Sequence, residues 1–244
     1  LHLGAINMAF AHAYMKMRKP VIATSYIVEA KVHYIESSQP WRIELCRPEE
    51  ATALWASREY ERAKEIYAEI AEAAEDSGDK GFAATQWGNV AMCESRLGYH
   101  ERARAMFRHL LPIYDRLGLE YNRATTMCEL GRMAIRESGR LDEMLCGLLE
   151  LDRLGAISEW VIAHLVIAEE MALRGDITAQ MIALQKGYRR AVAFHLKVDA
   201  VTALDMLRKM AQRGEATPEA IREVAESTDF SVDRQVMGCD GSIN

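Results

Sequence analysis

Seven histidines and five cysteines are the side chains of this sequence that could bind a metal ion or carry out nucleophilic and acid–base chemistry. The histidines occur singly, with no HExxH motif and no pair at helical spacing: His2, His12, His33, His100, His109, His164 and His195. The cysteines include no CxxC pair: Cys46, Cys93, Cys128, Cys146 and Cys239. These patterns predict no metal site, no cofactor and no disulfide framework. We interpret the histidines as structural and the cysteines as reduced, mostly buried thiols of a cytoplasmic protein.

Catalytic residues cannot be assigned from motifs in this sequence. It contains no Gly-rich phosphate loop and no GxSxG nucleophile motif. Glu169 and Glu170 are adjacent, and adjacent residues of a helix point in different directions, so they do not form a dyad. A Cys–His nucleophile at Cys93 or Cys128 stays open because its partners would meet in space, although a free cysteine is usually a small core residue. We therefore expect no catalytic residues.

The elements that position these residues are predicted to be helices. Of the 244 residues, 50% are apolar and 27% are charged, which is typical of a folded globular chain. Good helix formers dominate, and only five prolines interrupt them. The net charge of -6 argues against direct nucleic-acid binding, which depends on lysine and arginine. The longest apolar stretches, such as 160–168, are far shorter than the ~20 residues of a membrane span, so we expect no membrane partner.

Recurring glycines divide the sequence into units. The sequence Asp-Arg-Leu-Gly occurs at 115–118 and again at 152–155, a shift of 37 residues (152 − 115), and a weaker copy ends at Gly78. Glycine suits the left-handed position that ends a helix. Further glycines, Gly98, Gly139 and Gly175, fall inside the units, 41 and 36 residues apart. Each unit is therefore predicted to be a helix, a tight turn and a second helix, and such periods are typical of helical solenoids.

The third unit contains the most specific motif. Its residues match the spacing of the pattern W-x2-L-G…A-x3-F: Trp87, Val90, Ala91, Gly98, Ala103 and Phe107. Here the sequence resembles the tetratricopeptide repeat, with Val90 and Ala91 in place of Leu-Gly and Glu94 in place of the usual Tyr. The resemblance extends over roughly residues 4 to 190. The units are longer than the standard repeat. In this greater length they resemble the units in the solenoid arms of bacterial ATP-dependent transcription activators and in kinesin light chains.

The resemblance implies an all-α fold, a right-handed superhelical solenoid of about five to six antiparallel helix hairpins with long repeats. The expected hairpins are 4–37, 48–78, 80–118, 120–155 and 157–193, followed by a C-terminal cap at 197–228. The segment from Ser37 to Pro48 is expected to be an irregular insertion. Residues 229–244 are expected to form a flexible tail.

The resemblance also implies a binding groove, because the first helix of each tetratricopeptide hairpin lines the concave face. The implied groove residues are His12, Lys16, Gln86, Asn89, Met92, Arg96, Glu129, Arg132 and Arg136. Arg96, Arg132 and Arg136 would form a basic strip that clamps an acidic segment or a chain terminus. In the alternative, these arginines pair with Glu94, Glu129 and Glu137 of the same chain. Methionines on the first helices could likewise be exposed in the groove or form a soft core.

The expected function is a protein- or peptide-binding scaffold or sensor module. The alternative is the ligand-sensing arm of a bacterial transcription regulator whose DNA-binding or ATPase part is absent from this sequence. A third hypothesis is an enzyme with its active site in the solenoid cavity. Homo-oligomers could form through the solenoid ends, where an apolar hairpin face is left uncovered, and the N-terminal end, which opens on Leu1 and Leu3, is favoured.

Overall fold

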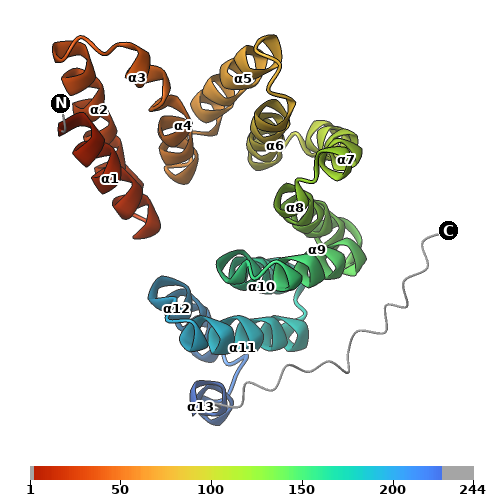
Figure 1. Ribbon diagram of the computed structural model, residues 1–244. Coiled ribbons are helices and arrows are strands. Elements are labelled where there is room, and N and C mark those ends of the chain that lie inside the picture. Colours follow the sequence, from red (N-terminus) through yellow and green to blue (C-terminus); the bar gives the residue numbers. More distant parts are fainter. Residues whose placement is uncertain (1–2, 227–244) are drawn as a thin grey trace. The chain divides into compact units, whose positions relative to one another are not determined.

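Residues 3–226 are described by a computed structural model, and in this range the chain is helical without a β-strand (Figure 1). The all-α prediction is confirmed. The chain divides into two compact units, Leu1–Ala156 and Ile157–Asn244. Unit 1 contains α1 (Leu3–Lys16), α2 (Pro20–Glu36), α3 (Trp41–Glu44), α4 (Arg47–Ala56), α5 (Tyr60–Asp76), α6 (Lys80–Arg96), α7 (His100–Leu117), α8 (Glu120–Ser138) and α9 (Asp142–Arg153). Unit 2 contains α10 (Ile157–Arg174), α11 (Ile177–Ala193), α12 (Lys197–Gln212) and α13 (Pro218–Glu226).

Neighbouring helices pack against each other in a helical repeat arrangement. In unit 1, α1 packs on α2, α4 on α5, α6 on α7 and α8 on α9, and successive hairpins meet through α2–α4, α5–α6 and α7–α8. Figure 1 shows α4, α6 and α8 along the inner side of unit 1 and α5, α7 and α9 along its outer side. The insertion expected after Ser37 contains the short helix α3, so it is less irregular than predicted.

Most helices end in the same turn. At Gly78, Gly98 and Gly118 the φ angle is +81°, +91° and +67°, so each predicted turn glycine adopts the left-handed conformation. The N–H of the following residue donates to the carbonyl five residues back, as from Asp79 to Ala74 at 2.9 Å. This bond satisfies a carbonyl that the helix end leaves free, which is the Schellman arrangement. These backbone hydrogen bonds reverse the chain, and at Gly78 the Ser77 hydroxyl also donates to the Ala74 carbonyl.

The structure reveals a 40-residue register in the first three hairpins. The buried residues Ala23, Ala63 and Ala103 are 40 residues apart (63 − 23 and 103 − 63), and each is followed four positions later by a buried large residue: Ile27, Tyr67 and Phe107. The small residue lets two helix backbones approach, and the large one fills the adjacent groove. The sequence hid this register because Arg18, Ser38 and Arg58, and not glycine, occupy the left-handed positions of the early turns.

In the fourth hairpin the large residue lies on the second helix, where the first three hairpins have a small one, and the small residue lies on the first helix. Met144 of α9 occupies the position where the other hairpins have alanine, and it is fully buried. It faces Gly131 of α8, where an added Cβ would lie 2.4 Å from the Met144 backbone nitrogen. The glycine thus provides the close approach that the alanine provides elsewhere.

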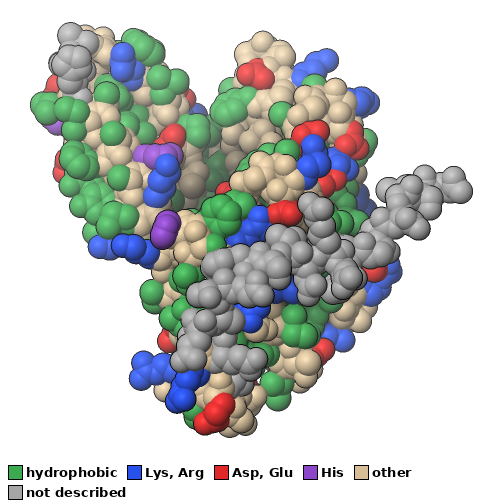
Figure 2. Space-filling view, turned by 60° about the horizontal axis from the view of Figure 1, so that its bottom comes forward, with side chains coloured by type: hydrophobic (Ala, Val, Ile, Leu, Met, Phe, Trp, Pro, Cys, Tyr) green, Lys and Arg blue, Asp and Glu red, His purple; other side chains and the backbone are tan. Residues whose placement is uncertain are grey.

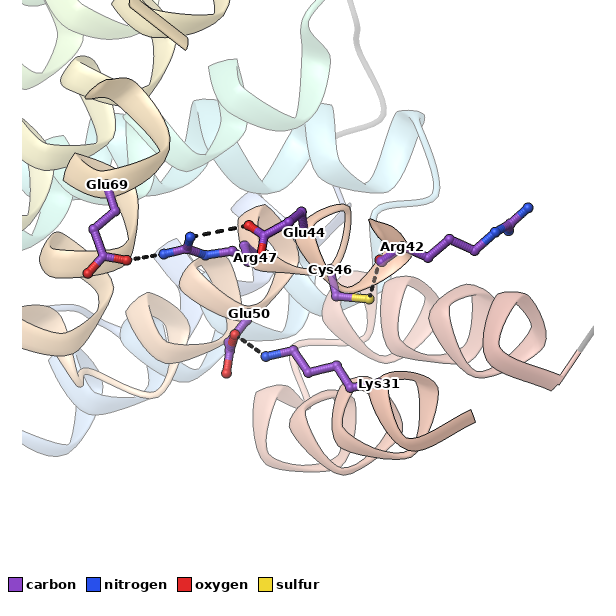
Figure 3. A network of polar contacts seen from close by, with 7 residues as sticks. All are labelled: Lys31, Arg42, Glu44, Cys46, Arg47, Glu50 and Glu69. Atoms are coloured by element: carbon purple, nitrogen blue, oxygen red, sulfur yellow. Dashed lines mark hydrogen bonds and ion pairs between the residues drawn. The ribbon is translucent and has the colours of Figure 1, made fainter. Parts of the chain in front are cut away.

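Ion pairs connect the first hairpin to the second. Figure 3 shows Lys31 of α2 reaching Glu50 of α4, and Arg47 at the start of α4 lying between Glu44 of α3 and Glu69 of α5. These side chains are partly exposed, so each pair contributes up to about 1 kcal/mol. Together they fix the segment between α2 and α4, where the chain lacks a tight two-helix turn.

Unit 2 repeats the helix-turn-helix arrangement. α10 packs on α11 and α11 on α12, with left-handed turns at Gly175, His195 and Gly214. Pro218 begins α13, because proline fits the first turn of a helix. The predicted tail at 229–244 and the last two residues of the predicted cap lie outside the described residues. That both units form one continuous solenoid stays a prediction.

Every helix in residues 3–226 is too short or too polar to cross a lipid bilayer. The polar residues that prevent this include the ion-pairing side chains of the hairpins, since charged groups are costly in hydrocarbon.

Replacing Arg58 by glycine should stabilise unit 1. Arg58 is exposed, has φ of +66°, and its side chain makes no hydrogen bond or ion pair with residues 3–226. Glycine adopts this conformation without the Cβ clash, so we expect Arg58→Gly to raise the free energy of unfolding by about 1 kcal/mol in urea denaturation. The matched control Arg62→Gly, inside α5, should lower it by a similar amount. A destabilised Arg58→Gly variant would contradict the assigned turn.

Candidate functional site

Three of the predicted groove residues form one ion-pair cluster on α6 and α8. Arg96 of α6 binds Glu129 of α8 in bidentate fashion, with Nη1–Oε2 at 3.1 Å and Nη2–Oε1 at 2.9 Å. Arg132, one turn further along α8, donates from Nε to Glu129 Oε2 at 3.0 Å and from Nη2 to Ser95 Oγ at 2.6 Å. The cluster thus connects the first helices of two successive hairpins.

The two guanidinium groups of the cluster share one carboxylate of the same chain. Burial acts to raise the pKa of Glu129, but the guanidinium groups of Arg96 and Arg132 outweigh it and hold that pKa below its usual value. The alternative interpretation therefore applies to Arg96 and Arg132: both pair with Glu129. A partner carboxylate at this place would have to compete with Glu129 for them.

The other carboxylates and arginines of the predicted strip are arranged differently. Glu94 lies 3.4 Å from Lys64, and Glu137 pairs with Arg104. Arg136 is exposed one turn beyond Arg132. The structure therefore brings Arg96 and Arg132 together at one carboxylate.

The remaining predicted groove residues lie on two different hairpins. Gln86 is buried on α6 and accepts a hydrogen bond from Asn89 at 3.1 Å. Met92 packs against the core cluster of Ala91 and Phe107, which favours the soft-core interpretation for this methionine. His12 and Lys16 are exposed on α1.

The α6–α8 face contains little enclosed space. A pocket of about 30 Å³ lies between Asn89, Met92, Asn122 and Glu129, which is room for about one water molecule. A partner on this face would therefore bind to a polar surface and not in a cavity.

A larger groove, which the sequence analysis did not identify, lies between α6 and α7 beside the end of α5. Its volume is about 410 Å³. The apolar floor consists of Ala83, Ala84, Trp87, Met106, Leu110 and Ile113. Ligand sites of this size are typically apolar with a few well-placed polar groups. This groove is larger and more apolar than the pocket on the α6–α8 face, so we take it as the stronger candidate site.

The rim of the α6–α7 groove is basic. Lys80, His109 and Arg116 are exposed on the rim, and their side chains make no hydrogen bond or ion pair anywhere in residues 3–226. The rim carboxylate, Glu75, accepts a hydrogen bond from Trp87 Nε1 at 2.8 Å and so orients the indole ring. The groove therefore combines an apolar floor with cations available to a ligand anion.

The sequence indicates which groove residues share a face of each helix, but not which faces meet. The α6 residues Lys80, Ala83, Ala84 and Trp87 are spaced i, i+3, i+4 and i+7, which places them on one face of the helix. The α7 residues Met106, His109, Leu110, Ile113 and Arg116 follow the same kind of spacing. Which face of α6 meets which face of α7 is a tertiary property, so the groove was missed.

The two cysteines considered as nucleophiles, Cys93 and Cys128, are held as thiols by burial. Burial raises the pKa of both Cys93 and Cys128 to about 12, so both remain thiols at neutral pH. Within residues 3–226, no group of three or more His, Cys, Asp or Glu residues is placed to hold a metal ion.

Unit 2 contains one deeply buried histidine, His164 of α10. Its Nδ1 lies 3.0 Å from the Trp160 carbonyl oxygen, and because a carbonyl only accepts, Nδ1 carries the proton. The rings of His164 and Trp160 are 3.7 Å apart, and the Arg190 guanidinium lies 4.2 Å from the Trp160 ring centre. Burial lowers the pKa of His164 to about 4, against the opposing effect of the Trp160 carbonyl. At neutral pH the side chain is therefore an uncharged packing residue.

No model of a known protein family matches this sequence. No curated protein matches it either. The interpretation of the candidate site therefore depends on its geometry and chemistry.

Removing the carboxylate of Glu129 should destabilise unit 1. Glu129→Gln removes the carboxylate that both guanidinium groups bind, and we expect a loss of about 2 kcal/mol in urea unfolding at neutral pH. Because the folded state depresses the pKa of Glu129, this contribution is present above the usual carboxyl pKa and declines as pH falls through the folded value. The variant should lack that acid-dependent part. The exposed control Glu72→Gln should retain the acid-dependent part. If the free energy of unfolding depended on pH equally in the wild type and in Glu129→Gln, the cluster would be contradicted.

Unit 2 should lose stability between pH 6.5 and pH 4. In this window the unfolded chain binds a proton at His164 while the folded chain, whose pKa is about 4, does not. The difference from the ordinary value of 6.5 corresponds to about 3 kcal/mol. Unfolding followed by Trp160 fluorescence should show this loss in the wild type and not in His164→Phe. The exposed His195→Asn should behave as the wild type, and a pH-independent wild type would count against the burial of His164.

Proposed function

We propose that this chain is a protein-binding module, a scaffold or sensor that holds a peptide segment on the helical hairpins of unit 1. The α6–α7 groove carries the proposal, because it offers about 410 Å³ of apolar space beside two cations, Lys80 and Arg116, whose side chains form no ion pair within the described chain. A segment that places one large apolar side chain near Trp87 and carboxylates near Lys80 and Arg116 would complement both features.

The α6–α8 face, which the tetratricopeptide resemblance implies as the binding surface, is the alternative place for the same kind of segment. On that face the carboxylate of Glu129 already binds Arg96 and Arg132. A ligand carboxylate would replace an existing ion pair there, whereas at the α6–α7 groove it would form a new one. This difference favours the α6–α7 groove.

The proposed module would work in the cytoplasm, where thiols such as those of Cys46 and Cys93 stay reduced. It would need no cofactor, since recognition by an apolar groove and a basic rim depends on side chains alone.

The proposal is tested with a panel of labelled peptides that carry one Leu, Phe or Trp between acidic residues. Binding is followed by fluorescence anisotropy, and matched peptides carry Lys in place of the acidic residues. We expect the acidic peptides to bind and the basic ones to bind at least tenfold more weakly, because two exposed ion pairs contribute roughly 1–2 kcal/mol. Equal affinity for both series would contradict the proposed recognition.

Variants locate the site. Lys80→Glu with Arg116→Glu should reduce the affinity for acidic peptides by about tenfold or more, since attraction becomes repulsion. The control Arg102→Glu, on the exposed N-terminal part of α7 away from the groove, should leave it unchanged. If Arg96→Glu abolished binding while the Lys80 and Arg116 reversals did not, the peptide would occupy the α6–α8 face instead.

A further inference from the structure

The outer face of α2 is apolar and exposed. Val21, Val28, Val32 and Ile35 have 73%, 53%, 46% and 62% of their surface accessible. The opposite face of α2 is also apolar, and it is buried: Ala23, Ile27, Ala30 and Tyr34. Figure 2 shows hydrophobic side chains gathered over the N-terminal hairpin. A helix that is apolar on both sides is normally covered on both sides.

The 40-residue register shows that this face is unusual. In α5 and α7 the positions equivalent to Val21 are Glu61 and Glu101, and those equivalent to Ile35 are Glu75 and Asp115. All four carboxylates are exposed. The outer face of the second helix is thus a charged, solvated surface in the two following hairpins and an apolar surface in the first.

Stacking of another hairpin on α1 would not cover this face. The α1 residues Leu3, Ile6 and Phe10 are exposed, and their equivalents in α6 are Ala83, Gln86 and Val90, all of which are buried. Those positions are therefore the ones that a neighbouring hairpin covers. The positions of Val21, Val32 and Ile35 have exposed equivalents in α5 and α7, even though those hairpins have neighbours on both sides, so the α2 face needs a different partner.

The spacing of the stripe identifies the shape of that partner. Positions 21, 25, 28, 32 and 35 are separated by 4, 3, 4 and 3 residues, which is the seam of a heptad coiled coil. Four of the five are β-branched valine or isoleucine, and the fifth is Ser25. Stiff β-branched side chains at these positions suit knobs-into-holes packing against another α-helix.

We propose that the α2 face binds the α2 face of a second copy of this chain, with the two helices parallel. The flanking charges support this occupant and this direction. Parallel pairing sets Lys31, which binds Glu50 of its own chain, beside Glu36 of the second copy as an additional carboxylate, because such pairs are five residues apart in a parallel coiled coil. Antiparallel pairing about Val28 would instead set the exposed Glu29 against Glu29 of the second copy. Like charges in that position are repulsive.

The oligomeric state tests the proposal without reference to the peptide-binding groove. Sedimentation equilibrium over a concentration series should show a wild-type dimer. The triple variant Val21→Glu, Val32→Glu and Ile35→Glu introduces the residues that α5 carries in the same register, so it should fold and should be monomeric. Its circular dichroism and its affinity for acidic peptides should match the wild type. The control pair Glu61→Gln and Glu72→Gln should remain dimeric.

A wild type that is monomeric throughout the series would overturn the proposal and leave the face to a helix of another protein. A triple variant that still dimerises would overturn it as well. The direction is tested by disulfide crosslinking in single-cysteine variants. Val21→Cys, at one end of the stripe, should crosslink between copies in a parallel pair. Crosslinking of Val28→Cys without Val21→Cys would exclude the parallel arrangement.

Discussion

The left-handed residue at most helix ends is the constraint on which the rest of this structure depends. It allows the next N–H to bond to the carbonyl five residues back, and this backbone hydrogen bond reverses the chain. From Arg58 to Gly118 the reversals recur every 20 residues, at Gly78 and Gly98. Because the reversals recur at a constant interval, the helices return with the same face inward, and the small residues meet the next helix at each crossing.

Charge pairing between neighbouring helices is the second organising feature. Arginines and lysines that reach a carboxylate on a neighbouring helix fix the helices against each other: Lys31 with Glu50, Arg96 with Glu129, Arg104 with Glu137, and Arg123 with Glu150. Two of these pairs, Arg96–Glu129 and Arg104–Glu137, both span 33 residues. The cations of the α6–α7 groove rim are not used in this way, which separates structural cations from those available to a ligand.

The α2 surface is a departure from the repeat. It lacks the charges that α5 and α7 carry at the same positions. A repeat fold is stabilised mainly by contacts between neighbouring units, so its outer surface can vary without loss of the fold. Residues that break the pattern on such a surface are therefore candidates for function.

The sequence by itself determined the helices, the turn glycines and the close-packed pair Ala103 and Phe107, because helix periodicity and left-handed turns depend on residues near each other in the chain. It did not reveal the 40-residue register, because Arg18 and Arg58 occupy the left-handed turn positions at which later turns have glycine. Only the tertiary structure decided that Glu129 holds Arg96 and Arg132, and that the faces of α6 and α7 enclose a groove. Those features depend on which helix faces meet, and no local pattern specifies that.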